Sequence, residues 1–287
     1  IGEKEWKNET KQTMLGRFRL QKLIREMKRE NCSYAVIETS SEGILQHRHR
    51  FIDYDMAVFT NITPEHIERH GGFENYRKAK VKLFERVAKK ENGIGVYNLD
   101  DENADYFLKP EIENKYGITI SNLKSKISKI EKGKFKEIIK ITDIKLSSSD
   151  SVFKINNLEF KIPIIGEFNV YNFAAAACVA LSQGISLPKI KEAAPNLKLP
   201  PGRLEIIKAK KGFNVVIDYA HEPASLEAVY KTIRNPQFLI HNSKLICLLG
   251  GQGGGRDKWK RKVMGELAGV FCDEIILTNE DPYDEKP

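Results

Sequence analysis

The residues of this sequence that are best suited to chemistry are Glu38, His66, His70 and Lys80. Glu38 ends the apolar run Val36-Ile37, the histidines lie four residues apart, and Lys80 flanks the apolar stripe of an expected helix. In an open α/β sheet, side chains at strand ends and helix starts converge on the ligand-binding crevice. Oxygen ligands and positive charges in such a crevice predict a magnesium ion and a substrate that carries phosphate.

Glu38 and Lys80 each allow a second explanation. A carboxylate at the end of a buried strand is costly unless it is paired or bound to a cation, so Glu38 could equally form a salt bridge to Arg48 or Arg50. Lys80 lies between two other lysines, which is typical of a solvated basic helix face. A partly buried lysine, however, has a lowered pKa and can act as a reactive amine.

His66 and His70 would share one face of a helix, because residues four apart are neighbours there. This spacing is familiar from zinc sites. The sequence offers no third nitrogen or sulfur ligand nearby, and Glu65 is outside the HExxH register. Zinc-dependent hydrolysis is therefore disfavoured relative to a magnesium site.

Two later segments follow apolar runs and could contact a nucleotide or another anion. Asp218-Tyr-Ala-His221 precedes Pro223 at the expected start of a helix, and its carboxylate could bind a ribose hydroxyl. Gly250–Gly255 precedes Arg256 and matches neither GxGxxG nor GxxxxGKS, so we expect a flexible substrate loop. The sequence contains no GxSxG motif, which argues against serine hydrolysis.

Length and composition indicate a soluble globular protein with two domains. The 287 residues carry a net charge of +8, with 30% charged and 41% hydrophobic residues. The basic residues are spread along the chain, which favours a solvated basic face or an anionic small substrate over nucleic acid. Four cysteines lie far apart without a CxxC motif, and no apolar stretch approaches the ~20 residues of a membrane span. We therefore expect a cytoplasmic protein without nucleic-acid or membrane partners.

Apolar periodicity predicts an α/β fold with a mostly parallel central sheet flanked by helices, an antiparallel β addition, and a smaller Rossmann-like C-terminal domain. Buried strands of the central sheet are expected at 34–39, 56–59 and 94–98. Short alternating runs at 117–120, 137–141, 151–155 and 160–164 predict the antiparallel addition, with a hairpin turn at Asn156-Asn157. Helices are expected at 20–30, 73–89, 173–183, 187–194, 225–234 and 258–271, and C-terminal strands at 204–208, 214–219, 245–249 and 274–278.

Residues 195–202 contain three prolines and a glycine and are the best candidate for a domain boundary. We therefore expect a central domain at 1–198 and a smaller, truncated C-terminal domain at 199–287. The chain begins without an initiator Met and stops soon after an expected strand, so it reads as an internal piece of a longer protein.

The order of eight segments carries a family resemblance. They are Glu38-Thr-Ser-Ser41, Thr60-Asn-Ile-Thr-Pro-Glu-His66, Tyr76-Arg-Lys-Ala-Lys80, Asn98-Leu-Asp-Asp101, Gly166-Glu-Phe-Asn-Val-Tyr-Asn172, Pro201-Gly-Arg203, Asp218-Tyr-Ala-His221 and Thr278-Asn-Glu-Asp-Pro282. In this order they resemble the Mur ligases of bacterial cell-wall synthesis, and among these the tripeptide-forming type. The resemblance covers nearly the whole chain.

The resemblance implies an ATP-dependent ligase that adds an amino acid to UDP-N-acetylmuramoyl-L-alanyl-D-glutamate in peptidoglycan precursor synthesis. ATP would convert the substrate carboxylate into an acyl phosphate, which the incoming amino group attacks. Glu38, His66 and Lys80 would hold Mg²⁺, with Lys80 as a carbamylated lysine. Asn169 and Asn172 would lie against adenine, Arg203 near the γ-phosphate, and Asp218 and His221 around ribose and phosphate. The substrate would contact Thr39, Ser40, Ser41, Arg256, Asp281 and Glu285.

Two departures from the family pattern qualify these expectations. The family's GxxGKT/S loop, which holds the ATP phosphates, is absent from these 287 residues, so we expect that the isolated chain does not turn over ATP. Ligases of this type that add diaminopimelate carry Asp-Asn-Pro-Arg where this chain has Glu280-Asp-Pro-Tyr283, and tyrosine cannot make the bidentate contact to a carboxylate that arginine makes. The added amino acid therefore stays open between lysine, another diamine and diaminopimelate.

Two alternatives also stay open. Folylpolyglutamate and cyanophycin-type ligases share the architecture, but they read Asp-Gly-Ala-His-Asn-Pro where this chain has Asp218-Tyr-Ala-His-Glu-Pro223. The second alternative is a non-catalytic remnant, in which the phosphate-binding loop would be missing from the protein itself and not only from these 287 residues. We expect the full-length protein to be a monomer.

Overall fold

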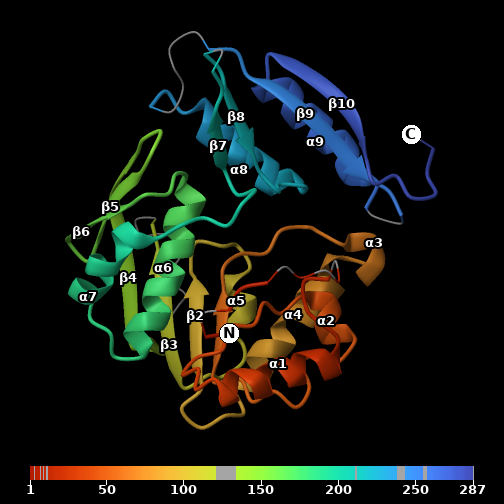
Figure 1. The fold of residues 1–287 in the computed structure, drawn as a ribbon. Helices are drawn as coiled ribbons and strands as arrows, with labels where there is room; N and C mark the ends of the chain where they lie inside the picture. Colours follow the sequence, from red (N-terminus) through yellow and green to blue (C-terminus); the bar gives the residue numbers. More distant parts are fainter. Residues whose placement is uncertain are drawn as a thin grey trace.

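A computed structural model of the chain describes all residues except 3, 7, 9, 11, 121–133, 211, 238–242, 255, 256 and 287. The larger body, at the bottom of Figure 1, is a sheet covered by helices, and a smaller body of two short sheets and two helices lies above it. None of the helices in the described ranges combines the length and apolar character that crossing a membrane requires.

The larger body is built on a six-stranded sheet whose spatial order follows the sequence. Its strands are β1 (Met56–Phe59), β2 (Ile94–Asn98), β3 (Asn114–Thr119), β4 (Glu137–Leu146), β5 (Ser151–Ile155) and β6 (Leu158–Ile162). The pairs from β1 to β4 are parallel, and those from β4 to β6 are antiparallel. The predicted mostly parallel sheet is confirmed.

The extent of the antiparallel addition was predicted wrongly. The runs at 117–120 and 137–141 belong to β3 and β4, which continue the parallel part of the sheet. The antiparallel part consists of β5 and β6 together with the edge of β4 that pairs with β5. In the turn between β5 and β6, Asn156 and Asn157 have positive φ angles of 47° and 69°, as predicted for a hairpin turn.

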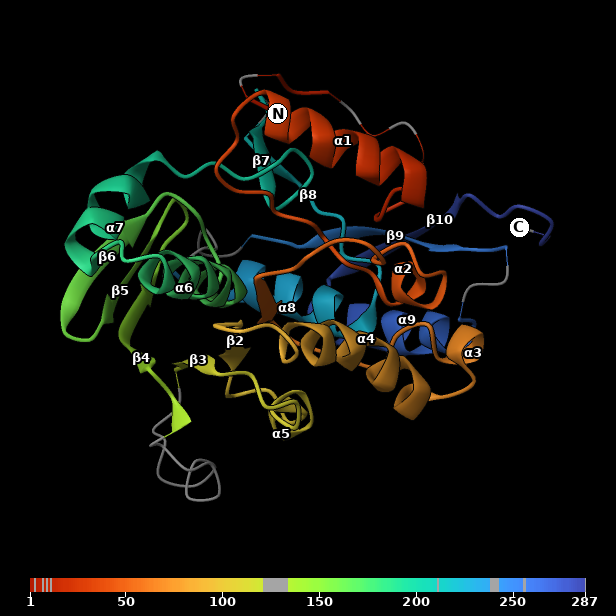
Figure 2. The same ribbon diagram turned by 90° about the horizontal axis from the view of Figure 1, so that it is seen from below.

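Helices cover both faces of this sheet, as predicted, because side chains alternate between its faces. On β2, Val96 packs in the cluster beneath α6 (Glu167–Ser182), while Tyr97 packs on the other face with Phe84 of α4 (Phe73–Val87). The central turns of α6 carry no charge, consistent with their burial. Figure 2 shows α6 and α7 (Leu187–Ala193) beside β4–β6. The remaining helices of this body are α1 (Arg17–Arg29), α2 (Ser41–Leu45), α3 (Ile67–His70), α5 (Ala104–Phe107) and the 3₁₀ turn η2 (Ala194–Asn196).

The expected buried strand at 34–39 is absent. This segment has no strand pairing among the described residues, and Val36 is 94% exposed. An apolar β-branched run is buried only where a neighbouring strand or helix covers it, and β1 pairs with β2 alone. Glu38 therefore lies on an exposed extended segment that leads into α2.

The smaller body contains the four predicted C-terminal strands in two separate pairs. Its elements are β7 (Glu205–Lys208), β8 (Asn214–Ile217), α8 (Pro223–Arg234), β9 (Ile246–Gln252), α9 (Trp259–Phe271) and β10 (Glu274–Glu280). β7 and β8 are antiparallel, β9 and β10 are parallel, and α8 packs against α9. An apolar cluster joins the two bodies: Ile165, with Phe168 of α6, packs against Leu204 and against Val229 and Ile233 of α8.

Candidate functional site

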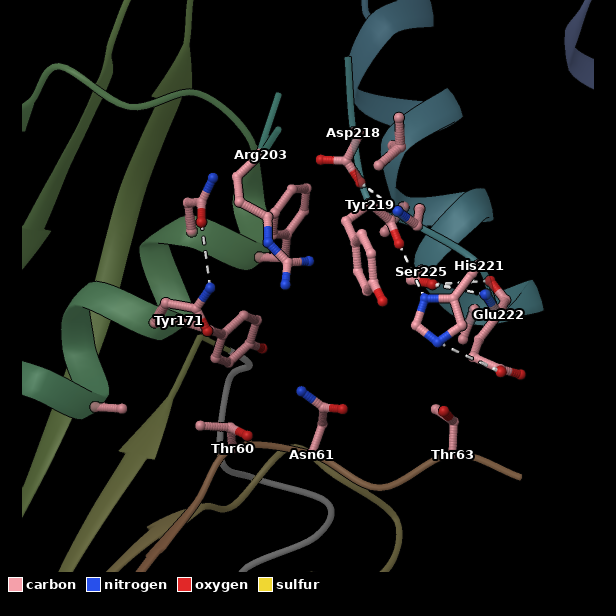
Figure 3. Close-up of a pocket in the computed structure, with 18 of the residues that line it drawn as sticks. Thr60, Asn61, Thr63, Tyr171, Arg203, Asp218, Tyr219, His221, Glu222 and Ser225 are labelled. Carbon is pink, nitrogen blue, oxygen red and sulfur yellow. Dashed lines mark hydrogen bonds and ion pairs between the residues drawn. The ribbon is translucent and has the colours of Figure 1, made fainter. Parts of the chain in front are cut away.

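A cavity of about 680 Å³ lies between the two bodies. Its lower wall is the loop after β1, with Thr60, Asn61 and Thr63, and its upper wall is the segment after β8 (Figure 3). The first turns of α6 and α8 close the remaining sides. The cavity lies beyond the carboxyl ends of β1 and β2, where open α/β sheets bind ligands.

Asn169 and Asn172 line the cavity from the start of α6. The Nδ2 of Asn169 donates to the carbonyl of Ile165 at 2.8 Å, and the Nδ2 of Asn172 donates to the Oδ1 of Asn169 at 3.2 Å. These bonds fix the amide of the buried Asn169. The structure thus brings both predicted adenine-contacting residues to the cavity in defined orientations.

Asp218 and Arg203 line the opposite wall. The two carboxylate oxygens of Asp218 accept hydrogen bonds from the backbone N–H groups of Leu204 and Ala220, each at 2.8 Å. Asp218 therefore ties the corner that carries Arg203 to the end of β8. The guanidinium of Arg203 lies 4.9 Å from the centroid of the Tyr219 ring and points into the cavity (Figure 3).

His221 and Glu222 lie where the same wall enters α8, and a buried lysine holds them. The Nζ of Lys260 donates to the Oε1 of Glu222 at 2.5 Å and to the carbonyl of His221 at 3.0 Å. The Nδ1 of His221 lies 2.9 Å from the carbonyl of Tyr219. Lys260 thus holds the backbone of His221, and the carbonyl of Tyr219 orients its ring at the cavity edge.

Glu65 connects the cavity to the predicted magnesium residues. Its Oε1 is 3.1 Å from the Nε2 of His66 and 4.0 Å from the Nε2 of His221, and its Oε2 accepts a hydrogen bond from Tyr76 at 3.2 Å. Burial alone would raise the pKa of Glu65, but the hydrogen bond and charge of His66 and the charges of Lys80 and His221 lower it to about 2. Glu65 is therefore an anion between two imidazoles that belong to different domains.

Lys80 lies beside this carboxylate, with its Nζ 5.0 Å from the centroid of the Tyr76 ring. Burial lowers the pKa of Lys80, while the charges of Glu65 and Glu38 act in the opposite direction. The structure thus brings the Glu38 carboxylate within electrostatic range of Lys80. Among the described residues, Glu38 forms no salt bridge to Arg48 or Arg50, which was the alternative explanation for its carboxylate. Arg48 bonds instead to Met14 and Gln46.

His70 and the hydroxyls before α2 have internal partners. The Oγ of Ser41 lies 3.1 Å from the Nε2 of His70, and Ser41 is buried. The Oγ of Ser40 caps α2 by accepting from Gly43 at 3.1 Å, and Thr39 donates to the carbonyl of Ile37 at 3.2 Å. The substrate roles of these three hydroxyls stay predictions.

The predicted substrate residues near the C-terminus lie outside the cavity lining. Asp281 is exposed, and its carbonyl accepts from the N–H of Gly253 at 3.2 Å. Glu285 pairs with Arg261 at 2.8 Å, and the hydrogen bond from Arg261 lowers the pKa of Glu285. Arg256 lies outside the described residues.

Two donor sets could receive a cation. Glu38, His66 and Lys80 are the predicted one, and Glu38 is exposed and accessible to a metal. Ligand atoms of Glu65, His221 and Glu222 also lie within 4.8 Å of one another. In the second set, however, Glu222 already binds the ammonium group of Lys260. A carboxylate that already pairs with a buried cation is a poor ligand for Mg²⁺, which disfavours the second set. The first set contains the buried amine of Lys80, and its magnesium role stays a prediction.

With this geometry in place, the comparisons with known proteins decide the family. The sequence matches the family described as "Mur ligase middle domain" over residues 1–180 and that described as "Mur ligase, glutamate ligase domain" over residues 202–287. The chain belongs to the Mur ligase family. The resemblance seen in the order of the motifs is therefore confirmed.

Individual relatives and solved structures of Mur ligases agree. The chain is 35% identical over 289 residues to the UDP-N-acetylmuramoyl-L-alanyl-D-glutamate–2,6-diaminopimelate ligase of Halalkalibacterium halodurans, covering 99% of this chain and 55% of the relative. It is 32% identical over 296 residues to a UDP-N-acetylmuramyl-tripeptide synthetase of Roseiflexus, covering 98% and 55%. A solved diaminopimelate ligase structure superposes with a TM-score of 0.62 at 30% identity, covering 95% of this chain and 53% of that one. The chain thus spans about half the length of the curated relatives it matches.

Sequence reasoning missed four residues that organise this Mur ligase site: Glu65, Tyr76, Glu222 and Lys260. Glu65 and Tyr76 stand within two of the motif segments that carry the resemblance, but the sequence assigns neither a role in the site. Glu222 stands where folylpolyglutamate and cyanophycin-type ligases carry the asparagine of Asp-Gly-Ala-His-Asn-Pro. This difference in the motif could have indicated a role for Glu222. Lys260 lies in a basic run. It is buried because it bonds to His221 and Glu222, which lie 39 and 38 positions earlier in the sequence, and no local sequence pattern reveals such a contact.

Proposed function

We propose that this chain is the nucleotide-binding core of an ATP-dependent ligase that joins an amino acid to UDP-N-acetylmuramoyl-L-alanyl-D-glutamate in the cytoplasm. The observation that carries this proposal is that Asn169, Asn172, Arg203, Asp218 and His221 all line one cavity. Its volume is in the range of small-molecule sites. Three separate segments supply these residues, at 169–172, at 203 and at 218–221, so their meeting is a property of the fold.

The proposed reaction has two steps. A carboxylate oxygen of the substrate attacks the γ-phosphorus of ATP, the bond to the β-phosphate oxygen breaks, and ADP leaves. The amino group of the incoming amino acid then attacks the acyl carbon, a proton is lost from nitrogen, and inorganic phosphate leaves with the bonding electrons. The guanidinium of Arg203 would neutralise charge on the transferred phosphoryl group, which is the main catalytic requirement of such steps.

Glu38, His66 and Lys80 are proposed to hold Mg²⁺ beside this cavity. When bound, the ion would neutralise phosphate oxygens of ATP and the acyl phosphate. Lys80 is suited to carbamylation because burial lowers its pKa and so favours the neutral amine. The amine nitrogen would attack the carbon of CO₂ and lose a proton, which converts a cation into an anionic oxygen ligand.

The other predicted site residues are assigned to the two remaining substrates. Thr39, Ser40, Ser41, Arg256, Asp281 and Glu285 are proposed to contact the UDP-linked peptide or the incoming amino acid. Relatives of this chain are named for diaminopimelate addition, but Tyr283 stands where those ligases carry an arginine. The amino acid is therefore proposed only as a diamine, with lysine and diaminopimelate as the two main candidates.

Nucleotide binding by the 287-residue chain tests this proposal. Calorimetry with ATP, ADP and GTP in the presence of Mg²⁺ should show binding of both adenine nucleotides and weaker binding of GTP. An Asn172→Ala variant should bind ADP about tenfold more weakly, the effect of losing roughly one hydrogen bond. Asn235→Ala, outside the cavity, should bind as the wild type does. Equal affinity for ATP and GTP, or an unaffected Asn172→Ala variant, would contradict the proposed site.

A further inference from the structure

One short segment of the C-terminal domain contacts both walls of the cleft. It runs from Asp257 to Lys260 at the start of α9, and we call it the bracket. Both end residues are charged, yet Asp257 is 5% exposed and Lys260 is 6% exposed. Buried charges are costly unless they are paired and hydrogen-bonded, so the partners of these two side chains are informative.

Asp257 reaches across the domain interface to the central domain. Its Oδ2 accepts a hydrogen bond from the backbone N–H of Ile67 at 3.0 Å, and its Oδ1 accepts one from the N–H of Glu68 at 3.1 Å. The N–H of Lys258 also donates to the Oε1 of Glu68 at 3.3 Å. A single side chain thus holds two consecutive amides of a segment 190 positions away in the sequence.

The residue immediately before those amides is His66, whose backbone is left-handed with φ 55° and ψ 30°. Such a conformation is unfavourable for a residue with a Cβ and persists only where the surroundings hold it. The two bonds to Asp257 supply that constraint. They thereby orient the Glu65–His66 pair toward the cleft.

Lys260 acts on the other wall. Its Nζ binds the carbonyl of His221 and the carboxylate of Glu222, which fixes the turn that presents His221. The two walls approach each other at Glu65 and His221, where the Oε1 and Nε2 atoms are 4.0 Å apart. Only two residues lie between Asp257 and Lys260, so the bracket is a short link between the two turns.

We propose that Asp257 and Lys260 are positioning residues that set the separation between Glu65–His66 and His221. The position of the C-terminal domain on the central domain then determines the geometry of the cleft where the ATP phosphates are proposed to bind. A buried ion pair is weak evidence for added stability, since well-packed apolar residues often stabilise equally well. Asp257 and Lys260 bond to opposite walls of the cleft. Their charges are better explained by a need to fix the relative position of these walls. The link to phosphate chemistry rests on the proposed function, whereas the positioning itself does not.

Amide hydrogen exchange on the unliganded 287-residue chain tests the proposal. In Asp257→Ala, the amides of Ile67 and Glu68 should exchange at least about tenfold faster than in the wild type, because each loses a bond to a charged acceptor. Asp257→Asn keeps one acceptor oxygen and should give an intermediate rate. Lys260→Met should shift the ring resonances of His221 in NMR spectra. Lys262→Ala and Glu266→Ala remove an exposed ion pair on the same helix and should change neither readout.

Unchanged exchange at Ile67 and Glu68 in a folded Asp257→Ala protein would overturn the proposal, as would an equal effect of Glu266→Ala. If Asp257→Ala does not fold, Asp257→Asn decides in the same way. The affinity for Mg·ADP, measured in parallel at a temperature at which each variant is folded, should fall in the Asp257 and Lys260 variants. A wild-type chain that binds no nucleotide would count against the proposed function and leave the exchange result standing.

Discussion

The two ends of the cleft are built differently. At the proposed nucleotide end, the side chains of Asn169 and Asp218 form hydrogen bonds with neighbouring backbone groups, which fix their positions without a ligand. At the proposed magnesium end, Glu38 lies on an exposed extended segment, and His66 has a left-handed backbone held from the other domain. The difference teaches that the first end is organised locally, whereas the second depends on long-range contacts.

The largest expected effect separates the two ends by chemistry. In a polypeptide that extends to the full length of the relatives, Lys80→Ala should lower the ligation rate by about 10²- to 10³-fold, the loss expected when one charge-stabilising group is removed. Adenine-nucleotide affinity should stay within about twofold, because Lys80 does not line the cavity. Short carboxylic acids such as formate should partly restore the rate by replacing the carbamate.

Lys82→Ala is the matched control for this prediction, since Lys82 is exposed on the same helix. It should ligate at the wild-type rate. Full ligation activity in Lys80→Ala without added acid would show that the magnesium end does not need this lysine.

The next effect should be confined to the nucleotide end. Asp218→Ala leaves the N–H groups of Leu204 and Ala220 without their acceptor and should lower the free energy of unfolding by about 2–3 kcal/mol. ADP affinity should fall as well, because the segment that carries Arg203 loses the hydrogen bond between the N–H of Leu204 and Asp218. Urea denaturation and calorimetry measure the two effects.

Asp218→Asn keeps one neutral acceptor and should lose about half as much stability as Asp218→Ala. Glu227→Ala, which removes an exposed ion pair with Lys231 in the same domain, should change the free energy of unfolding by under about 0.5 kcal/mol. If Asp218→Ala were as stable as this control, local organisation of the nucleotide end would be wrong.

The same difference explains how far the sequence could predict the structure. β1 and β2 were placed at their observed ends, and helix α4 at its observed start, because period-2 and period-3.6 patterns report which face of an element is buried. The 34–39 segment has the same apolar composition as a buried strand. Whether it is buried depends on a neighbour, which composition does not contain.

Site prediction followed the same rule. Residues in short ordered motifs, such as Asn169 and Asp218, could be assigned from the family resemblance, and the fold brings them to one cavity. Asp257 and Lys260 could not, because their partners lie 190 and 39 positions away. A charged side chain in a basic or glycine-rich stretch looks solvated until the fold buries it. Long-range polar contacts are therefore the part of this site that sequence reasoning misses.

The smallest of these effects tests the carboxylate that links the two ends. The folded pKa of Glu65 is about 2, below its ordinary value of 4.5. A depressed carboxyl pKa stabilises the fold above the unfolded pKa, and this contribution is lost as pH falls through the folded pKa. Between pH 4.5 and 2 the wild type should therefore lose about 2 kcal/mol more stability than Glu65→Gln, which carries no titrating charge. Glu102→Gln, an exposed glutamate, should follow the wild-type curve in urea denaturation across this range. Parallel curves for the wild type and Glu65→Gln would mean that His66 and His221 do not share this anion, and the two ends of the cleft would then be electrostatically independent.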